Sequence, residues 1–484
     1  MSGKQWEIHA AYGGLSAGDL GQIMGDPKLN PFTQAKLLAA ALAMPFKETG
    51  RAHYRALIQD ERGRQPYEQV QIADGLNWLE RLVLEHSPFD GFTVLPRYSF
   101  VLELHFELAR PYLSRDDDAF YIIDNPVRKD KVFKVPFVAP TSWKGSLRAA
   151  ATQGLLVVFA GLLPTEPPTN RTERENLLAK LWPERAQRVV LFGNEKQNDA
   201  DFLNRWLAKR LGVAEGELGQ AFAAYLIKHG YRTEKIEGRQ GRLFCFPTFF
   251  NQIGLEIINP HDRERRVGKN PILFECVPTG ASGTFRLLYV PYDFPSEVTP
   301  DETALRKQVQ GELPLVAGIV HDLLTVYGFG AKISSGFGVA EDRLVEPGRL
   351  VLKIAGLPSE EPKELKPVKP KQKKELRRYW KAENQLRDEF LTSEGEFVSE
   401  QQYKAYLESL GQECTKSDIQ LYEKAWKWWE QEGKALAKHR VEEPRPEPET
   451  PEPGWAERTF TSLEEMVEKT KSLADALAEK GEQR

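Results

Sequence analysis

Apolar residues recur at two different periods along this chain, and the change of period divides it into parts. Before residue 94 they follow helical spacing, most clearly over residues 67–86. Over residues 98–108 they alternate with polar residues, which is typical of a strand with one buried face. The same criteria predict helices over residues 142–163 and 303–327, and strands over 188–192, 242–249, 284–290 and 350–354.

The order strand, helix, strands, helix, strand predicts an α+β fold of the ferredoxin-like kind, with helices on one sheet face and the other face open for a ligand. Composition adds flanking segments to this core. The predicted parts are a helical extension (1–94), the core (95–355), a Pro/Lys linker (356–375), a charged Trp-rich helical region (376–441), a Pro/Glu linker (442–461) and an amphipathic helix (462–484).

Composition excludes some classes of protein. The 66 basic and 70 acidic side chains give a net charge of −4, which argues against a uniformly basic nucleic-acid binder but allows a local basic groove. Cys245, Cys276 and Cys414 form neither a zinc pair nor a disulfide framework. The chain opens without an apolar run, and residues 155–163 are too few to span a bilayer. We therefore expect a cytoplasmic protein with no membrane partner.

Two motifs have the chemistry of phosphate binding. Before the helix at 142–163, Pro136 and Pro140 favour an extended approach, and Thr141 or Ser142 can cap the helix start. Lys144 and Arg148 then share one helical face beside the unpaired backbone N–H groups. The second motif, residues 327–340, has four glycines within eleven residues. Its phosphate donors are Lys332, Ser334 and Ser335, and Phe329 or Phe337 could pack on bases. Taken singly, these motifs also fit an ordinary surface helix and a tight turn.

Together the motifs Ser-x-Lys-Gly-x-x-Arg (142–148) and Gly-x-Lys-x-Ser-x-Gly-Phe-Gly (330–338) resemble those of the RAMP superfamily of CRISPR proteins. The segments 191–194 and 241–246 also resemble the family, and the match covers roughly residues 95–355. The resemblance implies a ferredoxin-like RNA binder whose glycine-rich loop lies near the end of the core.

The segment Ile-Asp-Asn-Pro-Val-Arg-Lys-Asp (123–130) looks most like a loop of the backbone subunit of type III effectors, with Asn125 where serine is commoner. In that subunit the loop aspartate cleaves target RNA. The resemblance thus implies that Asp124 is catalytic and holds Mg²⁺ or another divalent cation, and that Lys129 contacts RNA.

Residues 259–269 match in position the β-hairpin, or thumb, that this family inserts into the bound duplex. Its cations Arg263, Arg265 and Arg266 suit the RNA backbone. The implied partners are guide CRISPR RNA, target RNA and other effector subunits, on which we expect the flanking extensions to dock. Three alternatives stay open. The first is a guide-binding scaffold in which Asp124 only forms a turn. The second is a guide-processing nuclease, which would normally have a histidine near the first helix, and the third is a Trp-rich adaptor built on the tail.

Overall fold

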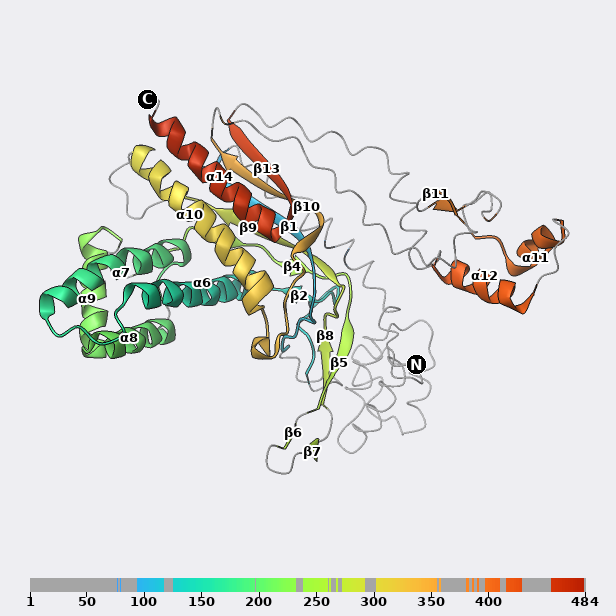
Figure 1. Ribbon diagram of the computed structural model, residues 1–484, viewed down its shortest axis with the longest axis horizontal. Helices are drawn as coiled ribbons and strands as arrows, with labels where there is room; N and C mark the ends of the chain where they lie inside the picture. Colours follow the sequence, from blue (N-terminus) through green and yellow to red (C-terminus); the bar gives the residue numbers. More distant parts are fainter. Residues whose placement is uncertain are drawn as a thin grey trace, which may run out of the picture. The chain divides into compact units, whose positions relative to one another are not determined.

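The protein is seen here in a computed structural model, drawn in Figure 1. The model describes residues 76, 79, 94–116, 125–195, 197–231, 238–259, 261–262, 267–268, 272–291, 302–354, 357, 380–382, 385–386, 390, 397–409, 415–428 and 454–482. The helices expected before residue 94 lie outside this part, except that Leu76 and Leu79 are helical. The chain forms two compact units, one of residues 1–363 with 453–484 and one of residues 364–452.

A five-stranded antiparallel sheet forms the framework of the larger unit (Figure 1). Its strands, in spatial order, are β13 (Trp455–Ser462), β10 (Arg343–Lys353), β1 (Phe100–Glu107), β9 (Ser282–Tyr289) and β3 (Leu243–Cys245). The strands predicted over 98–108, 284–290 and 350–354 are therefore confirmed, and the segment predicted over 242–249 forms two short strands, β3 and β4 (Thr248–Phe249).

Three helices cover one face of this sheet: α6 (Pro140–Leu162), α10 (Glu302–Asp322) and α14 (Leu463–Glu482) (Figure 1). A single turn of π-helix, Leu323–Tyr327, extends α10. Alternate residues of β1 point into the core between sheet and helices, because successive side chains of a strand lie on opposite faces. These buried residues are Phe100, Leu102, Leu104 and Phe106, packed with Trp143 of α6 and Phe285 of β9.

The start of α6 differs from the prediction. Ala139 is the N-cap, its side chain makes no capping bond, and Pro140 opens the helix. Proline suits this first position because its fixed φ is helical and its missing N–H would have no partner there. Thr141 and Ser142 are thus inside the helix, and both are exposed.

Among the described helices, α6 is long and apolar enough to cross a membrane. Its Trp143 and Phe159 are nevertheless buried in two protein cores, and the core helix of a folded domain meets the same criteria. The length and composition of α6 are therefore weak evidence for a membrane span.

A helical insertion between α6 and β3 has its own core. It contains α7 (Arg171–Phe192), α8 (Gln197–Leu211) and α9 (Glu215–Lys228). Trp182 and Phe222 pack with tilted rings in this core, which also contains Phe159 of α6. The strand predicted over 188–192 is wrong: these residues are the last turn of α7, and burial on every side gives them the apolar run of a buried strand.

The predicted hairpin is present in the part of residues 259–269 that the structure describes. Strands β5 (Gly254–Ile258) and β8 (Ile272–Cys276) are antiparallel, and β6 (His261–Asp262) pairs with β7 (Val267–Gly268) beyond them. Arg263, Arg265 and Arg266 lie outside the described residues.

The C-terminal segment differs most from the prediction. Residues 455–461, expected to be linker, belong to β13 at the edge of the sheet, and Arg349 Nε binds Glu457 Oε1 at 2.6 Å across the β10–β13 pair. Phe460 packs over Gly348, where an added Cβ would lie 2.2 Å from the phenyl ring. The amphipathic helix α14 packs against α10 in the same chain, so its apolar stripe is buried internally rather than against another subunit.

The smaller unit contains β11 (Trp380–Ala382), β12 (Gln385–Leu386), α11 (Glu400–Ser409) and α12 (Lys416–Trp428). Its buried aromatic residues are Phe390, Phe397, Tyr403 and Tyr422. In its described residues, the region expected to be charged, Trp-rich and helical thus contains the helices α11 and α12, a short β-pair and a core of its own.

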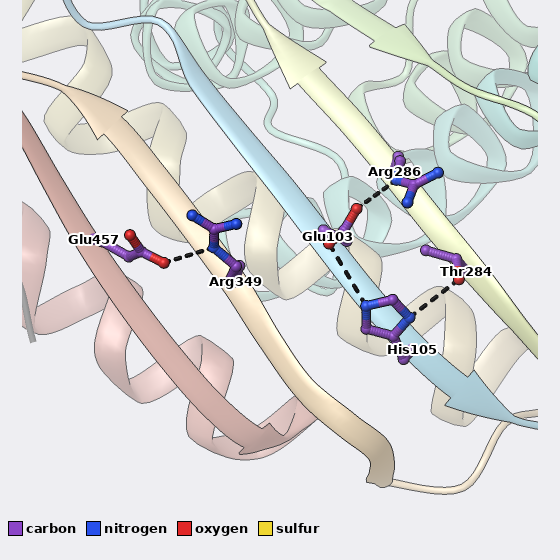
Figure 2. A network of polar contacts seen from close by, with 6 residues as sticks. All are labelled: Glu103, His105, Thr284, Arg286, Arg349 and Glu457. Atoms are coloured by element: carbon purple, nitrogen blue, oxygen red, sulfur yellow. Dashed lines mark hydrogen bonds and ion pairs between the residues drawn. The ribbon is translucent and has the colours of Figure 1, made fainter. Parts of the chain in front are cut away.

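A polar network crosses the sheet face opposite the helices (Figure 2). Glu103 of β1 forms an ion pair with Arg286 of β9 and lies 3.5 Å from His105 Nε2, while His105 Nδ1 is 3.1 Å from the Thr284 hydroxyl. Arg286 and Arg349, two basic side chains of this face, are thus paired within the protein, and the expectation that the face binds a ligand stays a prediction.

This network makes stability depend on pH. Burial alone would raise the pKa of Glu103, but the hydrogen bond from His105 and the charge of Arg286 together lower it from 4.5 to about 2. Because the folded-state pKa is depressed, the stabilisation is complete above pH 4.5 and is lost as the pH falls toward 2. It amounts to roughly 3 kcal/mol.

Glu103→Gln should remove this pH dependence of stability. Unfolding by urea at pH 7 and pH 3 tests it, with the exposed Glu346→Gln as control, and equal pH dependence in both variants would contradict the assignment.

Candidate nucleic-acid interface

The glycine-rich loop between α10 and β10 has a backbone that only glycine adopts readily. Gly328, Gly330 and Gly338 have φ of 74°, 91° and 72°. A Cβ at residue 338 would lie 1.9 Å from the carbonyl oxygen of Phe329, whose own N–H donates to the Gly338 carbonyl at 3.0 Å. The glycines therefore let the two sides of the loop touch at their backbones.

The loop presents polar side chains outward and its first phenylalanine inward. Lys332, Ser334 and Ser335 are exposed, the last two in the short 3-10 turn Ile333–Ser335. Phe329 is only 1% exposed and packs against Trp143 and Tyr112. The hypothesis that Phe329 packs on bases is therefore wrong, whereas the exposure of the three donors agrees with a role in phosphate binding.

The loop and the first half of α6 border one cavity of about 550 Å³. Its lining from α6 includes Gly145, Ser146 and Gln153, and its lining from the loop and the preceding turn includes Val326, Tyr327, Gly330 and Ser334. The two motifs expected to bind phosphate, separated by almost two hundred residues of sequence, thus lie side by side.

The basic residues of α6 differ in their surroundings. Ser142 is exposed, and Lys144 is half-buried beside Cys245. Burial lowers the pKa of Lys144, the Cys245 sulfur opposes this, and the charge of Arg148 adds to it. Arg148 is turned toward the helical insertion, where its Nη2 donates to the Phe192 carbonyl at 2.8 Å. Lys144 is thus better placed than Arg148 to meet RNA.

Asp124 lies outside the described residues, as do all of residues 117–124. The residues on either side, 111–116 (the upstream arm) and 125–130 (the downstream arm), are described. The N–H of Asp116 donates to the Pro126 carbonyl at 2.9 Å, and the N–H of Arg128 donates to the Ser114 hydroxyl at 2.8 Å. These bonds join the two arms at the base of the segment.

Each arm is also held by a different motif. On the upstream arm, the Leu113 carbonyl accepts a hydrogen bond from Ala331 of the glycine-rich loop at 2.7 Å. On the downstream arm, Asn125 forms a parallel bridge with Phe274 of β8, and Glu275 N donates to the Asn125 carbonyl at 3.0 Å. The described residues on the two sides of Asp124 are therefore bound to the glycine-rich loop and to the hairpin strand β8.

Lys332 connects the glycine-rich loop to the hairpin, because its ammonium group lies 5.2 Å from the ring centroid of Phe274. The loop after β1, the hairpin strand β8 and the glycine-rich loop thus meet around Phe274. No sequence pattern pointed to Phe274. A glutamate inside the apolar stretch Ile-Leu-Phe-Glu-Cys could have drawn attention to Glu275, which is fully buried.

Lys129, expected to contact RNA, is instead a buried residue. It is 7% exposed, its Nζ forms an ion pair with Glu275, and it donates to the Val127 carbonyl at 3.2 Å. The assignment of Lys129 to the RNA surface is corrected because a buried, paired ammonium group is not presented to a polyanion.

Comparison with known proteins places the chain in a family. The model of the RAMP superfamily matches residues 72–341, more than half of the chain. No curated protein matches it. One solved chain, from a cryo-EM structure of the type III-B Cmr-beta bound to cognate target RNA, is 12% identical, with 68% of this chain and 86% of that chain covered and a TM-score of 0.29. A likeness of that size carries no argument about the fold. From the family match, the chain belongs to the RAMP superfamily.

Proposed function

We propose that this chain is an RNA-binding backbone subunit of a type III CRISPR effector, with a ferredoxin-like core, and that its Asp124 cleaves target RNA paired with the guide. The observation that carries the proposal is the meeting of the three motifs around Phe274. Asn125 pairs with that residue, Lys332 lies over its ring, and Phe274 itself belongs to the hairpin. Asn125, which follows Asp124 directly in the chain, is thus paired with the residue whose ring lies under the Lys332 ammonium group, a donor suited to phosphates.

Contacts with the guide would come from the glycine-rich loop and the first half of α6, the two elements on either side of the 550 Å³ cavity. Ser334 and Ser335 can donate hydroxyl hydrogen bonds to phosphate oxygens, and Lys332 and Lys144 supply positive charge. Contacts of this kind read the shape of the backbone, so sequence recognition would be left to base pairing with the guide.

The proposed reaction uses a nucleophile that RNA already carries. The 2′-oxygen attacks the adjacent phosphorus, the bond from phosphorus to the 5′-oxygen breaks, and that oxygen takes up a proton, leaving a 2′,3′-cyclic phosphate and a 5′-hydroxyl. The protein must hold the target in line and accept or relay the proton of the 2′-hydroxyl. The second of these tasks falls to Asp124.

A divalent cation fits this proposal only as a bridge to the RNA. The described residues contain no group of three or more His, Cys, Asp or Glu side chains that could hold a metal. Mg²⁺ commonly keeps several waters and takes one or two carboxylates together with phosphate oxygens, so Asp124 and the RNA would be its ligands. When bound, the ion would offset negative charge at phosphorus.

The experiment is to reconstitute the effector with one guide and to supply complementary RNA with and without Mg²⁺. We expect RNA to copurify with the complex, and we expect the supplied RNA to be cut into products ending in a 2′,3′-cyclic phosphate. Copurified guide without cleavage would support the scaffold alternative, and absence of both would contradict the proposal.

Lys332→Ala and Lys144→Ala should each weaken guide binding and lower the slope of log K against log salt concentration by about 1, because each removes one contact with a phosphate. Filter binding at several salt concentrations measures this. Lys353→Ala is a suitable control, because Lys353 lies on β10 and donates to the Leu95 carbonyl away from the cavity. An unchanged slope for both test variants would place the RNA elsewhere.

A further inference from the structure

The buried pair formed by Glu275 and Lys129 acts on main-chain atoms. Glu275 Oε2 accepts the N–H of Val127 at 3.2 Å, and Lys129 Nζ donates to the carbonyl of the same residue at 3.2 Å. The backbone N–H of Glu275 adds a bond to the Asn125 carbonyl at 3.0 Å. Three polar contacts from this pair thus fix the peptide backbone over residues 125–127.

Stability alone does not account for such a pair. Glu275 is fully buried and Lys129 nearly so, and removing two charges from water opposes most of the gain from their attraction. Apolar side chains of similar size would fill the same space at no loss of stability in many proteins. What apolar side chains could not do is hold the N–H and carbonyl of Val127 in one orientation.

We propose that the Glu275–Lys129 pair is a positioning device, which holds the segment immediately after Asp124 against β8 at the base of the hairpin. The inference rests on the proposed function, since it assigns the pair to cleavage. Asn125 follows Asp124 directly in the chain, so the direction in which the chain leaves the anchored residues limits where Asp124 can be. Because β8 is also a strand of the hairpin, a movement of the hairpin on RNA binding would be passed to the same segment.

The main test is the double variant Glu275→Leu with Lys129→Met, in the reconstituted effector. It keeps the volume and loses the polar contacts with Val127. We expect normal assembly, guide binding and target affinity, but cleavage of bound target roughly 10- to 100-fold slower in single-turnover experiments. Cleavage at the wild-type rate in a normally assembled complex would overturn the inference.

A conservative variant keeps the test decisive if the double variant does not fold. Glu275→Gln with Lys129→Met retains an oxygen that can accept the Val127 N–H and leaves no buried charge without its partner, so it should cleave within a few-fold of wild type. A loss as large as that of Glu275→Leu with Lys129→Met would show that the acceptor is not what matters, and would overturn the inference.

Hydrogen exchange at the Val127 N–H tests, independently of cleavage, whether the Glu275–Lys129 pair holds this part of the backbone. The Val127 N–H should exchange slowly in wild type and in Glu275→Gln with Lys129→Met, and clearly faster in Glu275→Leu with Lys129→Met. Equal protection of this N–H in all three would show that the pair does not hold the backbone, and would overturn the inference. An Asp124→Ala complex that still cleaves would instead defeat the proposed function, whatever the exchange result.

Discussion

Asp124→Ala should abolish cleavage of guide-complementary RNA while leaving guide binding and assembly unchanged. Loss of a group that transfers a proton in the transition state slows a reaction by roughly 10²- to 10⁴-fold. Guide binding should persist, because the exposed donors Lys332, Ser334 and Ser335 belong to the glycine-rich loop and are unchanged in this variant. The measurement is single-turnover cleavage of labelled target RNA beside a direct assay of guide retention.

The chain offers a matched control for this variant. Asp117→Ala removes the same charge from the same segment but changes the acidic triplet 116–118, which we interpret as solvated. It should cleave at nearly the wild-type rate. Equal loss in both variants would indicate that the segment needs its negative charge rather than one particular carboxylate, and unchanged cleavage in Asp124→Ala would remove Asp124 from the catalytic role.

Glu312→Leu should lower the free energy of unfolding by about 3–5 kcal/mol. Glu312 of α10 is 3% exposed, and its two carboxylate oxygens accept bonds from Arg242 Nη1 at 3.1 and 3.0 Å. Arg242 is 1% exposed, so the substitution leaves its positive charge buried with the carboxylate gone. Tyr289, which donates to Glu312 at 2.6 Å, loses its acceptor as well. Denaturant unfolding measures the change.

A second substitution separates the loss of the ion pair from the cost of leaving the Arg242 charge buried without a carboxylate. Adding Arg242→Met to Glu312→Leu removes the uncompensated charge and should recover most of the lost stability, because replacing a whole buried pair by apolar side chains is often neutral. If the double variant is as unstable as the single one, the pair itself stabilises the fold, and the explanation by a stranded charge is wrong.

Elements with one buried face could be predicted from the sequence. Strand β1 alternates and α10 has helical spacing, so the pattern of each identifies both its type and its inner face. The end of α7 could not be predicted in this way. Residues 189–192 are buried on all sides, and a continuous apolar run does not distinguish a buried helix from a buried strand.

The site could be predicted only where it is exposed. Ser334, Ser335 and Lys332 lie on the surface as expected, because glycines on both sides form a projecting loop. Lys129 was misplaced because its partner, Glu275, lies 146 residues away in the sequence. Strand β13 was missed for a similar reason, since Glu457 is buried through its ion pair with Arg349. Burial of a charged residue depends on a distant partner that local patterns do not reveal.

The connection between β10 and β13, which includes the residues of the smaller unit, joins two neighbouring strands of the main sheet. Lys353 at the end of β10 is directly opposite Trp455 at the start of β13, so the hundred or so residues between them replace what could be a short hairpin turn. An inserted module of this kind can lengthen, shrink or change its surface without altering the register of the strands on which it is mounted. Such a connection would let related chains exchange one accessory module for another while the five-stranded sheet stays the same.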